Sequence, residues 1–373
     1  MKTKKFFWIA FIVALAVLAL FYFLQYRNEP EVLKIGAILP LSGDNAKYGK
    51  SAQKGIELAL EELNTKWSMR KIRIIYEDDK GLTREGVNVF QKLIQQNNLP
   101  AIIGPLFSSV TLAIAPIAEK NKIVILSPSA SAPEITNAGN YIFRNVASDV
   151  FEGAVMNDFI NNHLSIENIG IIYINNDYGV GIKQVFSSNA KKEGLKIVFE
   201  ESYSQDSKDF RTILSKIKNS NVDAIYIIGY SELGKLLKQA YELGIKKQFL
   251  STVMFEDPEI LNIAGKAAEG VIYSSRTFDV SQPDSIAKIF IDRFKLKYNQ
   301  EPDIFAALSY DALNILSAVI KKTETSGEEI KNSLLNLSNF LTVTGSITFD
   351  KNGDVIQPAV IKIVKDGKFQ LLN

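Results

Sequence analysis

The chain has 373 residues, 46% of them hydrophobic and none of them cysteine, and its length predicts two domains rather than one. Its formal net charge is +2, but Lys2, Lys4, Lys5 and Arg27 precede every acidic residue, and from Asn28 onward 39 basic residues face 41 acidic ones. This balance argues against a nucleic-acid partner, and the lack of cysteine excludes disulfides, thiolate catalysis, cysteine-ligated zinc and a cysteine-borne lipid anchor.

The first thirty residues contain a basic start and then an unbroken apolar run at residues 6–24. A helix of that length covers roughly 28 Å, enough to cross the hydrocarbon core of a bilayer. Trp8 near one end and Tyr22 and Tyr26 near the other suit the two interfaces, and the lysines predict a cytoplasmic N-terminus. The small-x-small triplet at 14–16 lies inside the run, which favours an uncleaved anchor over a signal peptide.

We therefore expect a single-pass protein of the cell membrane with its ligand-binding part on the extracytoplasmic side. Residues 1–31 form the cytoplasmic stub, the anchor and a tether in this interpretation. The alternative is a secreted or periplasmic protein after signal cleavage.

From residue 32 onward, apolar strands alternate with amphipathic helices. The predicted order is strand 33–39, helix 48–63, strand 71–76, helix 84–96, strand 101–103, a helix beginning near 108, strand 122–126, strand 141–144 and helix 151–162. The apolar residues of the 48–63 helix recur on one face, as expected for a helix packed on a sheet.

At residue 169 the pattern begins again. The predicted order is strand 169–174, helix 181–193, strand 196–201, helix 210–219, strand 224–229, helix 231–243, strand 248–251, strand 271–274, and helices 285–298, 305–322 and 328–337. The end of the chain reads as a hairpin over 346–364, turning at Asn352-Gly353, and a second hairpin turning at 365–368. The sequence thus predicts an α/β fold of two doubly wound lobes, each a mostly parallel sheet covered by helices.

Two loops of one chemistry follow neighbouring strands in the first half of the chain. Residues 104–109 read GPLFSS and residues 127–131 read SPSAS. Ligands of open α/β sheets bind at the carboxyl edge of the strands, and Ser108 lies in the first turn of a helix, where free N–H groups attract an anion. A single serine in such a loop is more often a turn former or cap. Two such loops together predict a site for a small polar ligand.

Motifs for catalysis, nucleotides and metals are incomplete. His163 is the only histidine and falls at the polar end of a helix. Residues 229–236 approach a phosphate-binding loop, but Leu236 stands where a Ser or Thr would hold Mg²⁺. Residues 350–354 lack two of the acidic ligands of a calcium loop. We predict no enzyme activity, no cofactor and no metal site.

Several stretches, in order, resemble the branched-chain amino-acid-binding proteins of ABC importers, which have the type I periplasmic binding protein fold. They are LKIGAILPLSGDNAKYGKSAQKGIELALEELN, IIYEDDKG, IIGPLFSSVT, VILSPSASAPEIT, IGIIYINNDYGVG, VDAIYIIGY, AGKAAEGV and ALSYDALNIL. The resemblance implies two lobes that close on a ligand and are joined by three crossings. Lobe 1 is then residues 32–147 plus 276–342, and lobe 2 is residues 148–275 plus 343–373.

The resemblance also implies positions for the ligand. A ligand carboxylate is held by the first loop at Ser108 and by the second loop at Ser129, Ala130 and Ser131. Aromatic groups around the ligand correspond to Tyr48, Tyr178 and Tyr230, and an acidic cleft residue corresponds to Asp149.

One position departs from the family pattern. Val253 stands where amino-acid binders carry a glutamate that pairs with the ligand ammonium, and burying an unpaired ammonium is unfavourable. Either another acid replaces that glutamate or the ligand lacks an amine. Glu256 and Asp257 are close in sequence, although capping of the helix at Pro258 explains them equally well.

Three functions follow from this sequence. The first is an extracytoplasmic receptor of an ABC importer, which binds an amino acid or similar small carboxylate and contacts the permease subunits. The second is a ligand-sensing ectodomain that signals through a partner protein. The third is an extracellular hydrolase, for which the sequence offers no catalytic group.

Overall fold

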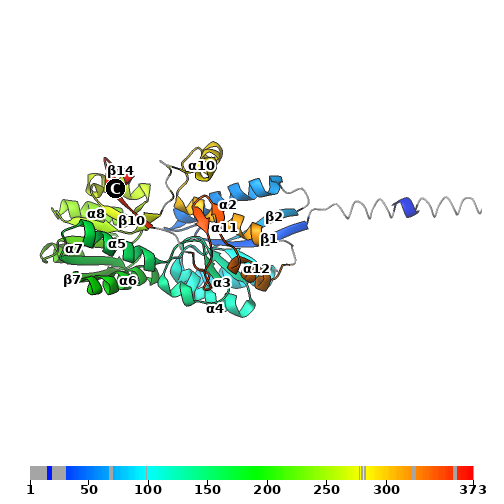
Figure 1. Ribbon diagram of the computed structural model, residues 1–373, viewed down its shortest axis with the longest axis horizontal. Helices are drawn as coiled ribbons and strands as arrows, with labels where there is room; N and C mark the ends of the chain where they lie inside the picture. Colours follow the sequence, from blue (N-terminus) through cyan, green and yellow to red (C-terminus); the bar gives the residue numbers. More distant parts are fainter. Residues whose placement is uncertain are drawn as a thin grey trace, which may run out of the picture.

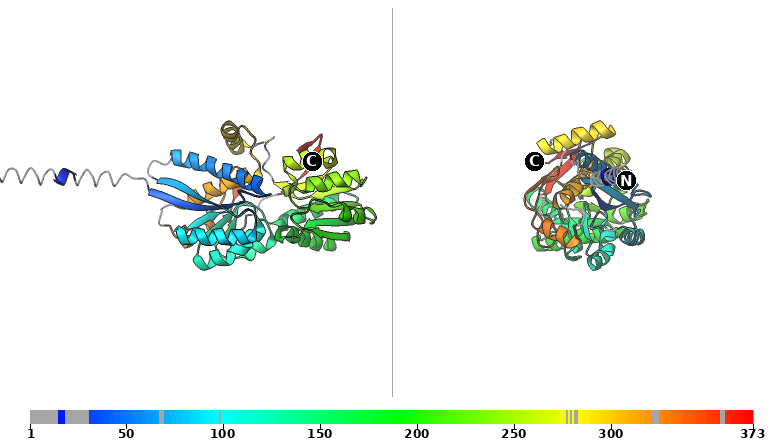
Figure 2. Two further views of the ribbon diagram at one scale, coloured as in Figure 1. Left: turned by 180° about the vertical axis from the view of Figure 1, so that it is seen from behind. Right: turned by 90° about the vertical axis from the view of Figure 1, so that its right-hand side faces the viewer.

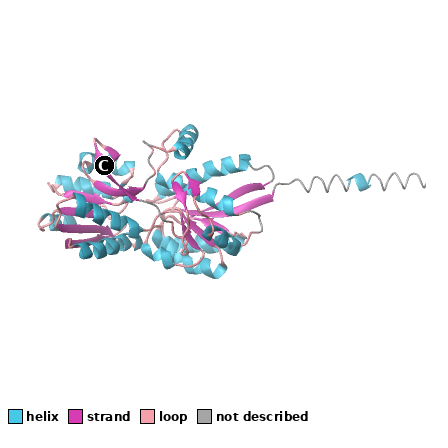
Figure 3. Cartoon of the chain, in the orientation of Figure 1, coloured by secondary structure: helices cyan, strands magenta, loops and turns pink. Residues whose placement is uncertain are grey.

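A computed structural model describes residues 15–18, 31–66, 70–97, 99–276, 278, 280, 283–320, 325–355 and 359–372. The described chain forms two lobes, each with its own β-sheet, placed end to end along the long axis (Figure 1). The view from behind shows the same division (Figure 2), and helices enclose the strands of each lobe (Figure 3). We call the lobe that begins with residue 31 the first lobe and the lobe that holds the C-terminus the second lobe.

Five parallel strands form the sheet of the first lobe. They are β1 (Glu31–Leu39), β2 (Arg70–Asp78), β3 (Ala101–Ile103), β4 (Val124–Ser127) and β5 (Ile142–Arg144), in the spatial order β2-β1-β3-β4-β5. The helices of this lobe are α2 (Ala46–Lys66), α3 (Thr83–Gln96), α4 (Ser108–Asn121), α10 (Ser285–Tyr298), α11 (Ile304–Val319) and α12 (Gly327–Leu335), with a 3₁₀ turn η1 (Pro133–Asn137).

Alternate residues of each strand serve opposite faces of this sheet. Ile102 and Ile125 belong to a core with α3 and α4, whereas Ile103 and Leu126 belong to the core with α2 and α11. A Cβ at Gly55 of α2 would lie 2.0 Å from the carbonyl oxygen of Ala306, so only glycine lets α2 and α11 approach this closely.

The second lobe contains a seven-stranded sheet. Its strands are β6 (Asn168–Ile174), β7 (Lys196–Tyr203), β8 (Ala224–Ile228), β9 (Gln248–Ser251), β10 (Ile272–Arg276), β13 (Ala359–Lys365) and β14 (Lys368–Leu371), in the order β14-β13-β10-β9-β8-β6-β7. Its helices are α5 (Asp149–His163), α6 (Asp177–Glu193), α7 (Arg211–Lys218), α8 (Leu233–Glu242) and α9 (Pro258–Ala264), with 3₁₀ turns η2 (Val253–Phe255) and η3 (Gly265–Ala268). β6 to β10 are parallel, and β13 and β14 add an antiparallel edge.

The chain passes between the lobes after β5, after β10 and after the small hairpin of β11 (Phe340–Thr342) and β12 (Gly345–Ile347). Asp311 of α11 holds the turn of this hairpin, just before the third passage, because its carboxylate accepts the backbone N–H groups of Val343 and Thr344 at 3.0 Å each. Elements from distant parts of the sequence therefore meet at the junction of the two lobes.

The predicted strands and helices occur in the predicted order, with bounds that differ by a few residues. The strand predicted at 122–126 begins at Val124, because Lys122 adopts the left-handed conformation (φ 54°) that ends α4. The hairpin turning at 365–368 is confirmed: β13 pairs with β14, and Asp366 and Gly367 both have positive φ, as a type I′ turn requires.

The hairpin predicted over 346–364 is confirmed only at its tip, where Phe349 and Val355 form an isolated antiparallel bridge, and its outer arms do not pair with each other. β12 pairs with β11, while β13 pairs with β10 and β14. Residues 350–354 form a local turn in which the Asp350 carboxylate accepts the N–H groups of Asn352 (2.8 Å) and Asp354 (3.0 Å). Gly353 has φ 80°, whereas Asn352 is not among the described residues with positive φ, so this is not a type I′ turn.

The apolar run at residues 6–24 lies outside the described residues except for 15–18, which are helical. Within the described ranges, no helix has both the length and the apolar character that a membrane span needs.

Candidate functional site

The two serine-rich loops lie side by side at the carboxyl ends of β3 and β4, which are neighbouring parallel strands. Two hydroxyls join them: Ser127 Oγ donates to the Pro105 carbonyl (2.6 Å) and Ser129 Oγ donates to the Leu106 carbonyl (2.7 Å). Ser127 Oγ also accepts the N–H of Ala130 at 3.0 Å. The loops therefore form one wall whose backbone is fixed before any ligand arrives.

Ser108 and Ser131 are both buried in this wall. Ser108 is the first residue of α4, and its Oγ accepts the N–H of Ala132 at 3.2 Å. The carbonyl of Ser131 accepts the N–H of Asp149, the first residue of α5, at 2.9 Å. The structure thus brings together Ser108, Ala130 and Ser131, as the sequence predicted for them as a group, while the Ser129 hydroxyl is used to join the two loops.

Five aromatic rings lie between the lobes. Tyr178 at the start of α6 stacks on Tyr230, with ring centroids 5.4 Å apart and 23° between the planes. Phe107 meets Tyr230 edge-on at 5.3 Å, and Tyr48 of α2 lies 6.2 Å from Tyr230 and 4.8 Å from Phe305. All five are buried, so the three tyrosines named from the sequence form one cluster with two phenylalanines that the sequence did not single out.

The tyrosine hydroxyls are held by residues of the second lobe. Tyr178 shares a 2.8 Å hydrogen bond with Thr252 Oγ1, Tyr48 accepts the N–H of Ser231 at 3.2 Å, and Tyr230 bonds the Asn176 side chain. Burial raises the pKa of all three hydroxyls well above the usual 10, so the rings stay neutral. The cluster presents an apolar, uncharged surface with hydrogen-bonding tips.

Two buried acids lie at the start of α5, below this cluster. Asp149 is fully buried, and Glu152 follows one turn later. Glu152 Oε1 accepts the N–H of Val253 at 2.6 Å and the hydroxyl of Ser274 at 2.7 Å. After burial itself, Glu152 and Asp149 are the next causes of the raised pKa of Tyr178. Two carboxyl groups therefore border the second-lobe side of the site.

Val253 and Glu256 lie at the junction of the lobes, around the end of β9. Glu256 Oε1 pairs with Lys362 of β13 at 2.7 Å, and Oε2 accepts the Ser275 hydroxyl. Both residues line a cavity of about 410 Å³, whose apolar walls include Phe278 and Ile304. The Glu256 carboxylate is thus directed towards β10 and β13.

Asp257 connects the lobes. Its carboxylate caps α9 by accepting the N–H of Glu259 at 2.9 Å, and it pairs with Lys47 of α2 at 2.6 Å. Lys47 also pairs with the Glu259 carboxylate. Together with the contact from Tyr48 to Ser231, this ion pair holds the lobes together across the aromatic cluster.

Arg144, Glu152 and Phe107 belong to this region but are not among the site residues predicted from the sequence. Phe107 directly precedes Ser108 and Glu152 follows Asp149 by one helical turn, so both could have been found by inspecting the neighbours of predicted site residues. Arg144 carries no local signal, because the residues that it contacts lie up to 210 positions away. Among the described residues, no group of three or more His, Cys, Asp or Glu could hold a metal ion.

Comparison with known proteins gives a consistent result. A family model described as periplasmic binding protein matches residues 32–368. The leucine-, isoleucine-, valine-, threonine- and alanine-binding protein of Pseudomonas aeruginosa is 30% identical over 346 residues, covering 91% of both chains.

Solved structures agree with this match. The branched-chain amino acid transporter substrate-binding protein of Streptococcus pneumoniae, in complex with isoleucine, superposes with a TM-score of 0.84 at 30% identity, covering 91% of this chain and 98% of that one. A leucine-binding protein of Thermotoga maritima gives a TM-score of 0.86 at 30% identity over the same shares.

Proposed function

This chain belongs to the periplasmic binding protein family, with the type I α/β fold, and we propose on that premise that it is the extracytoplasmic solute receptor of an ABC importer. The single observation that carries the proposal is the position of the Ser108–Ser131 wall, which faces an aromatic cluster built from both lobes. A ligand between them contacts both lobes, so its binding favours the closed arrangement. The protein releases this ligand unchanged and has no catalytic role.

The ligand class that we propose is an amino acid or a similar small carboxylate. A carboxylate is stabilised where several N–H and O–H donors converge, and the first turn of α4 beside the loop of Ser129, Ala130 and Ser131 offers hydroxyl and backbone donors. Tyr48, Tyr178 and Tyr230 then cover the apolar part of the ligand. The names of the relatives, which bind leucine, isoleucine or valine, support this class.

We propose that a ligand amine is met by Asp149 and Glu152 rather than by Glu256. Glu152 already reaches the backbone of Val253, the position at which the family resemblance places an acid. Glu256 is bound to Lys362 and Ser275 instead. The carboxylates of α5 then replace the glutamate that Val253 lacks.

The domain boundaries and the anchor complete the proposal. Lobe 1 comprises residues 32–147 and 276–342, and lobe 2 comprises residues 148–275 and 343–373. Residues 6–24 tether the receptor to the membrane beside the permease subunits. The apolar length and flanking charges of this segment support the tether.

The test is calorimetry of the full-length chain in mild detergent, titrated with L-leucine and with 4-methylpentanoate, which has the same skeleton without the amine. The proposal expects saturable binding of leucine, with an unchanged ligand recovered afterwards. Failure to bind any amino acid or small carboxylate would contradict it.

A further inference from the structure

Arg144, the last residue of β5, is a fully buried cation behind the serine wall. Nε donates to Asp354 Oδ1 (2.7 Å), and one terminal nitrogen donates to Asp354 Oδ2 (2.9 Å) and to Thr136 Oγ1 (2.7 Å). The other terminal nitrogen donates to the carbonyls of Ser131 (2.9 Å) and Ala132 (2.8 Å). All five N–H groups of the guanidinium therefore have acceptors.

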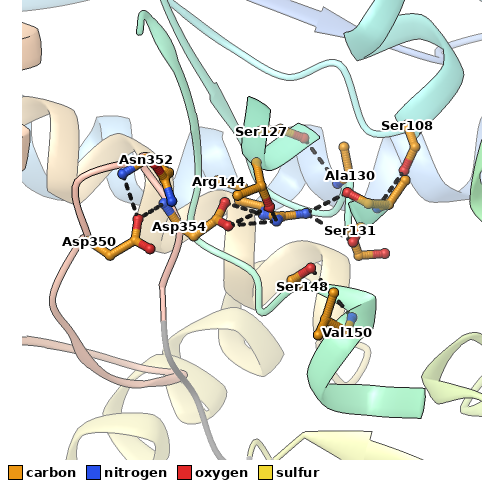
Figure 4. A network of polar contacts seen from close by, with 12 residues as sticks. Ser108, Ser127, Ala130, Ser131, Arg144, Ser148, Val150, Asp350, Asn352 and Asp354 are labelled. Atoms are coloured by element: carbon orange, nitrogen blue, oxygen red, sulfur yellow. Dashed lines mark hydrogen bonds and ion pairs between the residues drawn. The ribbon is translucent and has the colours of Figure 1, made fainter. Parts of the chain in front are cut away.

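One of these acceptors leads directly to Ser108. In the peptide group between Ser131 and Ala132, the carbonyl accepts a hydrogen bond from Arg144 and the N–H donates one to Ser108 Oγ. Figure 4 shows the guanidinium of Arg144 between Asp354 and this loop, with Ser108 on the far side of the loop. A single planar peptide thus connects the buried cation to the predicted ligand residue.

The state of the Ser108 hydroxyl follows from that contact. A hydroxyl has one hydrogen to donate and two lone pairs to accept with. Because the Ala132 N–H occupies a lone pair of Ser108 Oγ, the Ser108 hydrogen points elsewhere and is available as a donor. A cation on the peptide carbonyl polarises the peptide and strengthens the N–H as a donor.

On the side away from Ser108, Arg144 contacts the third passage between the lobes through Asp354 and Gly353. Asp354 ends the turn of residues 350–354, and the backbone N–H of Arg144 donates to the Gly353 carbonyl at 3.1 Å. A Cβ at Gly353 would lie 2.6 Å from the Ile142 carbonyl oxygen, so glycine permits this close approach. Thr136 Oγ1 also donates to Asp354 Oδ2 at 2.7 Å. The serine wall and the interlobe segment therefore share one anchor.

We propose that Arg144 is a positioning residue for carboxylate recognition: it fixes the Ser131–Ala132 peptide so that Ser108 is set as a donor towards the ligand, and through Asp354 it ties this wall to the third interlobe passage. The inference rests on the proposed function, since it gives Ser108 a carboxylate to meet. Arg144 itself stays buried behind the wall and acts through Ser108.

A double-mutant cycle in the full-length chain tests this. Lysine keeps the charge of Arg144 but lacks the planar fork that reaches Asp354 and both carbonyls. We expect Arg144→Lys to lower the affinity for L-leucine by about tenfold or more, but by less than about threefold when Ser108→Ala is already present, because coupled residues are not additive. Equal losses in both backgrounds would overturn the proposal.

A matched control separates positioning from general loss of stability. Asp311→Asn weakens another buried anchor, at the Val343–Thr344 turn of the β11–β12 hairpin, without touching the serine wall. We expect it to lower the thermal midpoint while leaving the leucine affinity of the folded protein unchanged. If Arg144→Lys does not fold, Thr136→Val serves as the milder variant, because it removes one bond from Arg144 and one from Asp354.

Hydrogen exchange in the ligand-free protein provides a readout that does not depend on the ligand. We expect the Ala132 amide to exchange at least about tenfold faster in Arg144→Lys or Thr136→Val, whereas the amides of β3 and β4 are unchanged. Unchanged exchange at Ala132 would overturn the proposal. If the wild type binds no amino acid or carboxylate, the proposed function fails, and this measurement still decides whether Arg144 positions the loop.

Discussion

The two walls of the interlobe site are built in different ways. The first-lobe wall is backbone and small hydroxyls, locked by bonds within its own loops and by Arg144 behind them. The second-lobe wall consists of larger side chains, namely Tyr178, Tyr230 and the acids at the start of α5. A wall of fixed donors suits a group that all ligands of one class share, whereas side chains are easily exchanged. We propose that the first wall provides affinity and the second provides selectivity.

Removing the anchor of the first wall should have the largest effect. Asp354→Ala leaves the buried Arg144 guanidinium without its counterion, and breaking a buried pair typically costs about 3–5 kcal/mol. The free energy of unfolding from denaturant titration measures this loss. Glu242→Ala, which removes a partner of the half-exposed Arg211, is the control and should cost less than about 1 kcal/mol. Similar losses for both variants would show that the buried Arg144–Asp354 pair contributes no more to the free energy of unfolding than an exposed ion pair does.

The next effect concerns the pH dependence of Asp311, which holds the turn of the β11–β12 hairpin. Burial raises the pKa of Asp311 to about 7, so the folded chain binds this proton more tightly than the unfolded chain, whose aspartates titrate near 3.8. Its contribution is therefore full below pH 3.8 and is lost as pH rises through about 7, by at most about 4 kcal/mol.

The difference in unfolding free energy between the wild type and Asp311→Asn, measured from pH 4 to 8, isolates this contribution. Relative to the variant, the wild type should lose stability as pH rises. A flat difference would show that Asp311 is ionised throughout that range.

The serine wall itself is tested by Ser108→Ala combined with Ser131→Ala. Each lost bond to a charged group is worth roughly 1.5–3 kcal/mol and the two are not additive, so affinity for L-leucine should fall by about 2–3 kcal/mol. Calorimetry measures the change, and Ser215→Ala on the exposed face of α7 is the matched control. An affinity equal to that of the control would show that the serine wall does not hold the ligand carboxylate.

The smallest predicted effect is on selectivity. Glu152→Gln should reduce the preference for L-leucine over 4-methylpentanoate by about tenfold, or about 1.4 kcal/mol, if the second wall meets the amine. Glu256→Gln should leave that preference unchanged, because the Glu256 carboxylate is held by Lys362. If Glu256→Gln reduces the preference and Glu152→Gln does not, the ligand amine is bound by Glu256 instead.

Most of the fold could be predicted from the sequence because local periodicity determines it. Apolar runs and amphipathic spacing place the predicted strands and helices within a few residues, whereas the short strand β11 is not predicted. The exception is the hairpin predicted over 346–364, where Asn352-Gly353 looks like a turn between paired strands. The Asp350 side chain shapes the turn through local bonds to Asn352 and Asp354. The partner that β13 finds in β10 lies more distant in the chain and leaves no local signal in the sequence.

From the residues alone, the site could be predicted only where it is local, and the distant tyrosines Tyr48, Tyr178 and Tyr230 were identified through the family resemblance. Ser108 and Ser131 stand in recognisable loops after strands, so sequence placed them together. Glu152 and Val253 are 101 positions apart, and Arg144 and Asp354 are 210 positions apart. Such contacts depend on how the chain passes between the lobes. No local pattern in the sequence indicates which distant residues will meet.

The most direct test of the account is a thermal-shift comparison of the wild-type chain with L-leucine, 4-methylpentanoate and L-leucinamide. A ligand that binds the folded state raises the midpoint by mass action. If the first wall holds a carboxylate, leucine raises the midpoint most, 4-methylpentanoate raises it less, and leucinamide, which lacks the carboxylate, leaves it unchanged. A shift with leucinamide equal to that with leucine would contradict the central claim.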